Sequence, residues 1–468
     1  MTEQGKMKHN RWLVVVGAIL IQIALGGIYA WSVFTYSLLK DPYNFTIAQT
    51  QAIFSACLLS FTLVMIFTNT KMKKIGFKPF LIIGGLALGG GYILGSQLET
   101  SFFIQFVCVG IIGGAGIGFA YGVPVAVCIK WFSDKKTLIS GLTAAGFGVG
   151  TLLWIKAGGS WFGLVDSLGV QSVFMYYGIA FIILVLVGSI LMSNPPEGYV
   201  PEGYKPTAAK EDSAKKGRLR NYTWQKMLNQ PAFWVIWLIF IFSGMAGLMV
   251  IGTIQLLGVD ILKNNGLDVR TACSAAGTAM AWFAIFSVLG IITWSNIGKK
   301  IGLRISIFLM ILTQGILMLT LFSMGNTPIM LVIYAAAIGF NFGGIYSLFH
   351  TAVAVLFGAK DVSSNYLFIF TAFGIAGIAG PTIGGLIRDN TGSFFMAFIS
   401  AGIVCIFGSL LALTIKMPEE RRAGGRRLGE KQEDLIEDQL ADADKRKILG
   451  SRKSSDRRIE EGVPWFPD

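Results

Sequence analysis

Lys156 is the one lysine or arginine in the interior of the long apolar stretches of this chain, because all others lie between the stretches or at their ends. The six residues before it, GTLLWI, offer no acidic partner, and a lysine near the centre of a bilayer costs roughly 2.5–3.5 kcal/mol on insertion scales. Two interpretations stay open. The ammonium group can reach the outer lipid headgroups along its flexible stem, or it can face an internal cavity and pair with an anionic ligand.

His350 and several aromatic or amide side chains also lie in apolar stretches, where polar groups are often functional. Because an imidazole titrates near neutral pH, His350 is a candidate for a proton-linked role, and a hydrogen-bonded structural histidine is the alternative. For the others, ligand contact competes with simple packing. The further candidates for the lining of a central cavity are Gln22, Tyr29, Trp31, Tyr121, Gln255, Asn341, Tyr346 and Tyr366.

Acidic side chains are absent from these stretches, since every aspartate and glutamate falls between them or at their ends. Intramembrane carboxylates are the usual proton carriers and cation ligands of pumps and symporters. Their absence weighs against sugar–proton symport through a buried carboxylate and against export of hard cations. The stretches also lack an acid–base pair, a metal cluster and a nucleophile beside a histidine, so we expect no enzyme, no metal and no cofactor.

Twelve apolar stretches must position these candidates. The chain has 468 residues, of which 53% are hydrophobic and 14% charged, whereas soluble domains carry about 25% charged residues. Runs of this length and uniformity are typical of membrane-spanning helices rather than barrel strands. The prediction is an all-α membrane protein with spans at 12–39, 48–69, 79–97, 101–129, 137–162, 171–192, 231–258, 270–295, 303–323, 327–357, 363–387 and 392–415.

Basic residues alternate from one side of these spans to the other. Of the 39 lysines and arginines, 34 fall on the side of the N-terminus and only four on the opposite side. By the positive-inside rule, both termini are expected in the cytoplasm, in a multi-pass protein of the inner or plasma membrane. The net charge of +13 then lies beside an anionic leaflet, so the expected partner is the bilayer and not nucleic acid.

The chain divides into two similar halves. Residues 73–78 read KKIGFK after the second span, and residues 299–304 read KKIGLR after the eighth. We therefore expect a duplicated architecture in which a substrate site lies between parallel six-helix repeats. The expected parts are a six-helix bundle at 1–193, a polar cytoplasmic linker at 194–230, a second bundle at 231–415, and a charged, disordered cytoplasmic tail at 416–468.

Several segments resemble the oxalate/formate antiporter family of the major facilitator superfamily. They include WFSDKKTLISGLTAAGFGVG at 131–150, MLNQPAFWVIW at 227–237, FNFGG at 340–344 and NY at 365–366. The resemblance runs from residue 10 to about 415 and implies a monomeric, alternating-access transporter of a small carboxylate such as formate, lactate or pyruvate, by antiport or proton-linked movement. Cavities in this architecture draw chiefly on spans one, four, seven and ten, which favours Tyr29, Tyr121, Asn341 and Tyr346.

The resemblance breaks at two positions where members of that family commonly carry cations. Alignment through KKIG and NY puts Ile291 at the position of an arginine in span eight, and Phe373 at that of a lysine in span eleven. Lys156 is similar to a lysine in the fifth span of pyruvate-transporter-like members. A monocarboxylate held by Lys156 and tyrosine hydroxyls is therefore expected. The alternatives are a facilitator for a neutral or weakly polar solute, and a nutrient sensor that signals through its tail.

Overall fold

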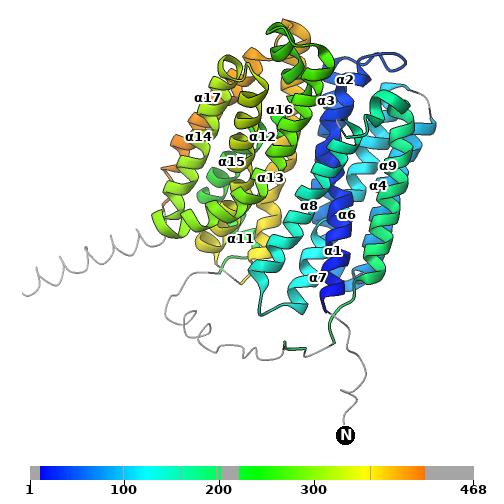
Figure 1. Ribbon diagram of the computed structural model, residues 1–468. Helices are drawn as coiled ribbons and strands as arrows, with labels where there is room; N and C mark the ends of the chain where they lie inside the picture. The colour runs from blue at the N-terminus through cyan, green and yellow to red at the C-terminus, as the bar shows by residue number, and fades with distance from the viewer. Residues whose placement is uncertain are drawn as a thin grey trace, which may run out of the picture. The chain divides into compact units, whose positions relative to one another are not determined.

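The computed structural model describes residues 11–98, 100–159, 161–196, 199–201, 221–358 and 360–416, without the side chains at 73, 136 and 137 (Figure 1). Its described helices belong to one compact unit, Met1–Ile415. Some consecutive helices form a single span, and counted in this way twelve helical segments of the described chain are long and apolar enough to cross a membrane. The prediction of an all-helical protein with twelve spans is confirmed. The disorder expected for the tail concerns residues 417–468, which lie outside the described residues.

The N-terminal set of helices contains the first six spans. The first span is interrupted by a short 3-10 helix and the fourth by a π-helical turn, and neither interruption was predicted. The elements are α1 (Arg11–Leu25), η1 (Gly26–Ala30), α2 (Trp31–Leu38), α3 (Ile47–Ile75), α4 (Lys78–Gln97), α5 (Phe102–Gln105), η2 (Phe106–Gly113), α6 (Gly114–Ala120), α7 (Gly122–Trp131), α8 (Lys136–Gly158) and α9 (Leu164–Leu191).

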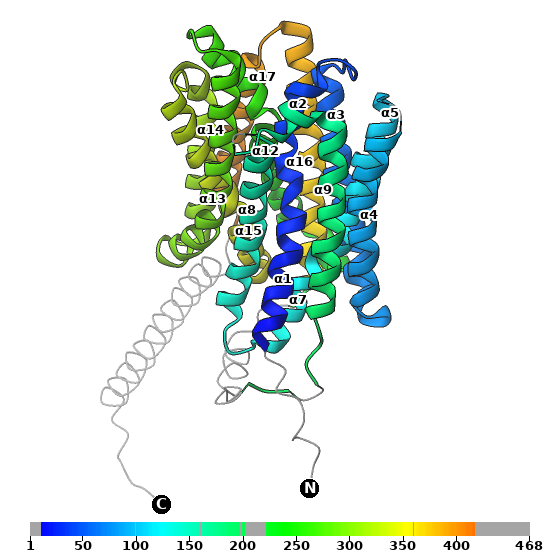
Figure 2. The ribbon, with the colours of Figure 1, turned by 45° about the vertical axis from the view of Figure 1, so that its right-hand side comes forward.

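The C-terminal set contains the other six spans, and a five-residue helix, α11 (Trp224–Leu228), precedes it inside the segment expected to be a linker. Figure 1 shows this set on the left and α1, α4, α7 and α9 on the right, and in the turned view of Figure 2 α13, α14 and α17 remain on the side opposite α4 and α9. The elements are α12 (Pro231–Asn264), α13 (Val269–Ile301), α14 (Leu303–Met324), α15 (Pro328–Phe357), α16 (Val362–Thr391) and α17 (Phe395–Ala412).

The two ends of the bundle are named here by their loops. The proximal end carries Arg11, the loop at 132–135 and Gly302, and the distal end carries the loops at 39–46, 265–268 and 392–394. Two helices that begin at the distal end, α3 and α13, have side-chain caps, which satisfy some of the first four N–H groups that lack intrahelical partners. Thr46 and Gln49 form a reciprocal capping box on α3, and Asp268 accepts from Thr271 N on α13.

The two KKIG segments adopt the same local structure. Gly76 ends α3 with φ 88° and ψ 173°, and Gly302 ends α13 with φ 89° and ψ 149°. Both glycines sit at a positive φ that residues with a Cβ rarely adopt. The sequence echo is therefore also an echo of backbone conformation at the proximal end of two corresponding spans.

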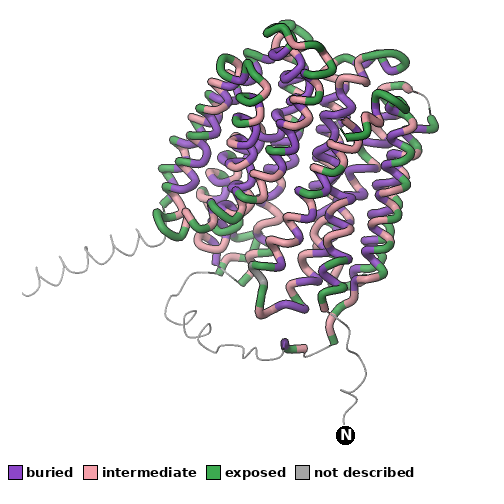
Figure 3. The backbone as a smooth tube through the Cα atoms, in the orientation of Figure 1, coloured by how far each residue is buried: buried purple, intermediate pink, exposed green. Residues whose placement is uncertain are grey.

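Glycines set how closely the fourth span approaches its neighbour. A Cβ added at Gly114 would come within 2.3 Å of the Cys57 carbonyl oxygen, and one at Gly118 within 2.6 Å of the Phe61 carbonyl oxygen. Small residues at four-residue spacing permit this backbone contact in lipid. Large apolar side chains lie on the outer faces of the helices, as Ile190 on α9 does with 78% of its surface exposed. Figure 3 shows such exposed positions along the outer faces of the helices.

Candidate functional site

The N-terminal and C-terminal sets meet chiefly along three helix pairs, α3 with α16, α8 with α13, and α2 with α12. The first pair is tightly packed, since a Cβ at Gly377 would come within 2.7 Å of Leu58 and one at Gly385 within 2.9 Å of Ala48. Residues near the middle of these helices from both sets therefore face each other. A ligand bound there would contact both sets at once, as a site between two repeats requires.

Four of the predicted tyrosines come together at this interface, and we call them the tyrosine cluster. Tyr29 from η1 and Tyr346 from α15 share a hydrogen bond between their hydroxyl oxygens at 3.0 Å, which joins the two sets. Tyr121, between α6 and α7, shares a ring neighbour with Tyr29, because Phe147 lies 5.1 Å from Tyr29 and 5.9 Å from Tyr121 between ring centroids. Tyr366 on α16 is the fourth member, and the Phe370 ring lies between it and Tyr346, with centroid distances of 5.9 and 6.4 Å.

Phenylalanine rings surround the cluster. Phe147 on α8 lies edge-on to Tyr29 with ring centroids 5.1 Å apart, and Phe342 is 5.6 Å from Tyr346. Phe61 contacts Tyr121 at 5.1 Å. The tyrosine cluster is thus a set of hydroxyl groups enclosed by apolar rings, and none of its members or of these rings carries a charge at neutral pH.

Phe373 completes this wall at the position where the family resemblance implies a lysine. It stacks on Phe370 with centroids 4.8 Å apart and an interplanar angle of 15°, and it lies 6.1 Å from Tyr346. The ring occupies space in which an ammonium group would stand beside the hydroxyls. Ile291, the counterpart of the implied arginine, is half-buried on α13.

Lys156 lies in the same interface but apart from the cluster. It follows Phe147 on α8 by roughly 13 Å along the helix axis, toward the distal end. Its ammonium nitrogen donates to the hydroxyl of Thr278 on α13 at 2.8 Å, which is a second hydrogen bond between the two sets. The side chain is half-buried, and its bond to Thr278 links α8 to α13.

His350 lies on the proximal side of the cluster. It follows Tyr346 by four residues on α15 and therefore projects from the same helical face. Its ring is 5.0 Å from that of Tyr366. The residue has an exposed surface, and its ring touches a member of the cluster.

The remaining candidates are buried within one set. Gln22 donates from Nε2 to the Tyr121 carbonyl oxygen at 3.3 Å, so it supports the backbone of a cluster residue. Trp31 donates to the Thr50 carbonyl oxygen, and Asn341 donates to the Thr313 hydroxyl on α14. Gln255 on α12 is 6% exposed, and its Oε1 would lie 3.9 Å from a Cβ added at Gly277 on α13.

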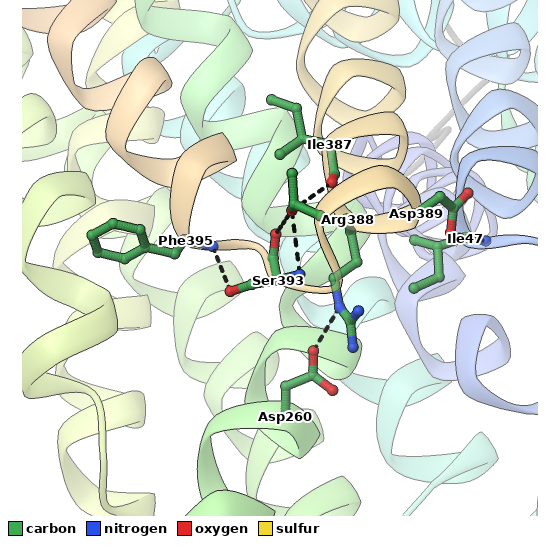
Figure 4. A network of polar contacts seen from close by, with 8 residues as sticks. Ile47, Asp260, Ile387, Arg388, Asp389, Ser393 and Phe395 are labelled. Carbon is green, nitrogen blue, oxygen red and sulfur yellow. Dashed lines mark hydrogen bonds and ion pairs between the residues drawn. The ribbon is translucent and has the colours of Figure 1, made fainter.

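Contacts at the distal end close the interface between the sets (Figure 4). The Asp389 carboxylate at the end of α16 accepts from the backbone N–H groups of Ile47 and Ala48 at 3.1 and 2.7 Å. Next to it, Arg388 forms an ion pair with Asp260 at 2.9 Å within the C-terminal set. Farther in, Gln51 donates to the Gly252 carbonyl oxygen. Ser55 and Thr382 then share a hydrogen bond of 2.9 Å.

Sequence reasoning missed the phenylalanine walls, Thr278 and Asp389. The rings had a signal that could have found them, because Phe342 and Phe370 lie four residues from Tyr346 and Tyr366 and so on the same helical faces. Thr278 and Asp389 had none, since their importance depends on residues more than a hundred positions away. In the part of the chain that the structure describes, no group of three or more histidine, cysteine or acidic residues could hold a metal ion.

Comparisons with known proteins agree on one family. The model of the Major Facilitator Superfamily matches residues 14–272 and 256–454. The oxalate:formate antiporter of Oxalobacter formigenes is 25% identical and aligns over 86% of this chain and 91% of its own. The apicoplast pyruvate carrier 1 of Toxoplasma gondii is 23% identical, over 79% and 82%. The crystal structure of nucleoside transporter NupG matches with a TM-score of 0.64 at 15% identity, over 88% and 100%.

Proposed function

This chain belongs to the Major Facilitator Superfamily and is a secondary transporter, and from that premise we propose that it carries a small monocarboxylate such as formate, lactate or pyruvate. The substrates printed in the names of its relatives, oxalate and formate for one and pyruvate for another, support this class. Their identities are low, so the case depends on whether the tyrosine cluster suits such an anion.

The hydroxyl pair of Tyr29 and Tyr346 is the observation that carries the proposal. Two phenol groups 3.0 Å apart can each turn from one another and donate to the two oxygens of one carboxylate. Hydrogen bonds to an ionised acceptor are roughly twice as strong as neutral ones, so replacing the bond between the two hydroxyls by bonds to a carboxylate is favourable. Because one hydroxyl comes from each set, a bound carboxylate would bridge the two halves of the molecule.

The surroundings of the cluster favour one negative charge over two. The wall residues Phe370 and Phe373 stack where the family resemblance implies a cation. A dicarboxylate such as oxalate would bring a second charge into an apolar wall without a partner, which is strongly unfavourable. A monocarboxylate instead places its one charged group on the hydroxyls and its small apolar part against the rings.

Lys156 supplies a positive charge on the distal side of the cluster, and His350 offers a site for a proton on the proximal side. Lys156 attracts the anion from the distal side, where it also donates to the neutral Thr278 hydroxyl. Emptying the site removes the anion from this cation, which favours exchange over free uniport. His350 can bind a proton in contact with Tyr366. An imidazolium there would accompany the carboxylate, so proton-linked transport is the second mode that this site supports.

We further propose that the bundles 1–193 and 231–415 rock against each other about this site, with the linker 194–230, the tail 416–468 and both termini in the cytoplasm. The charge asymmetry of the loops supports this orientation. The distal end is then the external end. Its contacts through Asp389, Gln51 and Ser55 would close the external side while the substrate exchanges with the cytoplasm.

Uptake of labelled formate, lactate, pyruvate and oxalate into proteoliposomes tests the proposal. Tyr346→Phe removes one charge-assisted hydrogen bond, worth about 1.5–3 kcal/mol, so uptake at low substrate should fall about 10- to 100-fold. Tyr334→Phe is the matched control, because Tyr334 is on the same helix but donates to Thr320 within the C-terminal set. Lys156→Met should also abolish uptake. Equal activity of the wild type and Tyr346→Phe would refute the site.

A neutral or weakly polar solute is the second candidate, because Phe373 leaves the cluster itself without a fixed cation. Hydroxyl groups enclosed by aromatic rings also suit a polyol or an amide. Competition separates the two candidates. Lactate should block labelled uptake while lactamide does not, and the reverse order would replace the carboxylate with an uncharged substrate.

A further inference from the structure

A second binding region lies at the distal end, apart from the tyrosine cluster. It is a pocket of about 580 Å³ between the first turns of α13 and α15. Its lining residues are Arg270, Thr271, Ser274, Ala275 and Thr278 on α13, and Pro328, Ile329, Val332 and Ile333 on α15. Every lining residue belongs to the C-terminal set, so we call this region the α13–α15 groove.

The α13 wall of the groove is polar. Thr271, Ser274 and Thr278 follow one another at three- and four-residue spacing, which puts their hydroxyls in one row below Arg270. The row ends at Thr278, whose hydroxyl accepts from Lys156. Positive charge thus borders the groove at both ends, from Arg270 at the distal end and from Lys156 beside Thr278. The Asp268 carboxylate nearby is already engaged by Thr271 N at the start of α13.

The α15 wall is apolar and faces outward. Ile329 is 72% exposed and Ile333 51% exposed, although both belong to a helix that crosses the membrane. Large aliphatic side chains exposed on such a helix are stable against lipid tails and not against water. The groove therefore has a polar, cationic wall beside a lipid-facing apolar wall.

We propose that the α13–α15 groove binds an anionic phospholipid of the distal leaflet. The Arg270 guanidinium donates a forked pair of hydrogen bonds to the phosphate, a geometry that arginine provides and lysine does not. The hydroxyls of Thr271 and Ser274 contact the glycerol region, and an acyl chain lies against Val332 and Ile333. Charge complementarity selects an anionic lipid over a zwitterionic one, because the cations at the two ends of the groove border a row of neutral hydroxyls.

This site is independent of the transported substrate, but it touches the transport machinery. The Thr278 hydroxyl joins the groove to Lys156 and so to the contact between α8 and α13. A lipid in the groove would press on the α13 side of that contact. Occupancy therefore stabilises the arrangement in which α8 and α13 are joined at the distal end.

Native mass spectrometry of the full chain, released from nanodiscs of equal phosphatidylglycerol and phosphatidylcholine, tests the proposal. The wild type should retain phosphatidylglycerol in preference. Arg270→Gln should lower that preference about tenfold, as expected for the loss of one charge-assisted contact. Lys263→Gln is the matched control, because Lys263 is an exposed basic residue at the same end and does not line the groove.

A second variant guards against misfolding of the first. Ile333→Trp fills the apolar wall and leaves Arg270 in place, so it should displace the lipid by bulk alone. Retention of phosphatidylglycerol unchanged in both variants would overturn the proposal. So would its displacement by millimolar inorganic phosphate or lactate at constant lipid, because the groove would then be a site for a free anion.

Discussion

Replacing Asp389 with alanine should open the distal end of the protein more often. The carboxylate accepts from the N–H groups of Ile47 and Ala48, the first two residues of α3, while Thr46 caps the N–H of Gln49. The first turn of α3 is therefore capped partly by its own set and partly by the other. When the two sets separate at this end, the Asp389 contacts are lost and the Thr46 contact remains.

The magnitude follows from the capping chemistry. Substituting an N-cap residue by alanine costs about 0.5–2 kcal/mol. Asp389 is exposed, so solvent screens its bonds and we take about 1–2 kcal/mol for the pair. Because this energy exists only in the distally closed state, its loss raises the population of the distally open state by a factor of about 5 to 30. Asp389→Asn should have a smaller effect, since an amide oxygen still accepts.

Labelling of a buried thiol measures that population. Ser55→Cys puts a thiol where Ser55 is 4% exposed and bonded to Thr382 across the interface. The thiol reacts with a membrane-impermeant maleimide, and its rate is obtained by subtracting the labelling of the same chain without Ser55→Cys. This rate should rise about 5- to 30-fold when Asp389→Ala is added.

Asp268→Ala is the matched control, because Asp268 caps the first turn of its own helix, α13. It removes a similar bond without joining the two sets and should leave the labelling rate of Ser55→Cys unchanged. Equal rates with and without the Asp389 carboxylate would refute the reasoning. So would acceleration of the same size by Asp268→Ala.

Three further predictions concern separate parts of the molecule. His350→Gln should abolish the stimulation of uptake by an inward proton gradient and spare exchange, and persistent stimulation would exclude His350 as the proton site. Gly343→Ala should lower the melting temperature sharply or prevent folding, since its Cβ would lie 1.8 Å from the Ser287 carbonyl oxygen, whereas Gly141→Ala meets nothing within 4 Å and should be neutral or slightly stabilising. Burial raises the pKa of loop residue Tyr43 from 10.0 to about 12. The folded state therefore keeps the phenol neutral where the unfolded state ionises it, so the contribution of Tyr43 to stability is full below pH 10 and declines between pH 10 and 12. Tyr43→Phe should remove this decline from melting temperatures measured across a pH series.

The sequence alone was enough to predict the membrane-spanning helices and their number. A bilayer leaves backbone polar groups no partner outside the helix, so twelve long apolar runs can only become twelve spans. It was also enough to nominate Tyr29, Tyr121, Tyr346 and Tyr366, because polar groups in apolar helices are few. The interruptions at η1 and η2 were not foreseen, since they depend on local packing against neighbouring helices.

Which candidates meet was decided by the tertiary structure. Tyr29 and Tyr346 are 317 positions apart and become partners only when the two sets pack together. Asn341 was favoured together with them and Trp31 was a further candidate, yet each turns into its own set, toward Thr313 and the Thr50 carbonyl oxygen. Periodicity fixes the face of a helix relative to its neighbours in the chain. It does not say which distant helix that face meets, because that choice depends on how all twelve pack at once.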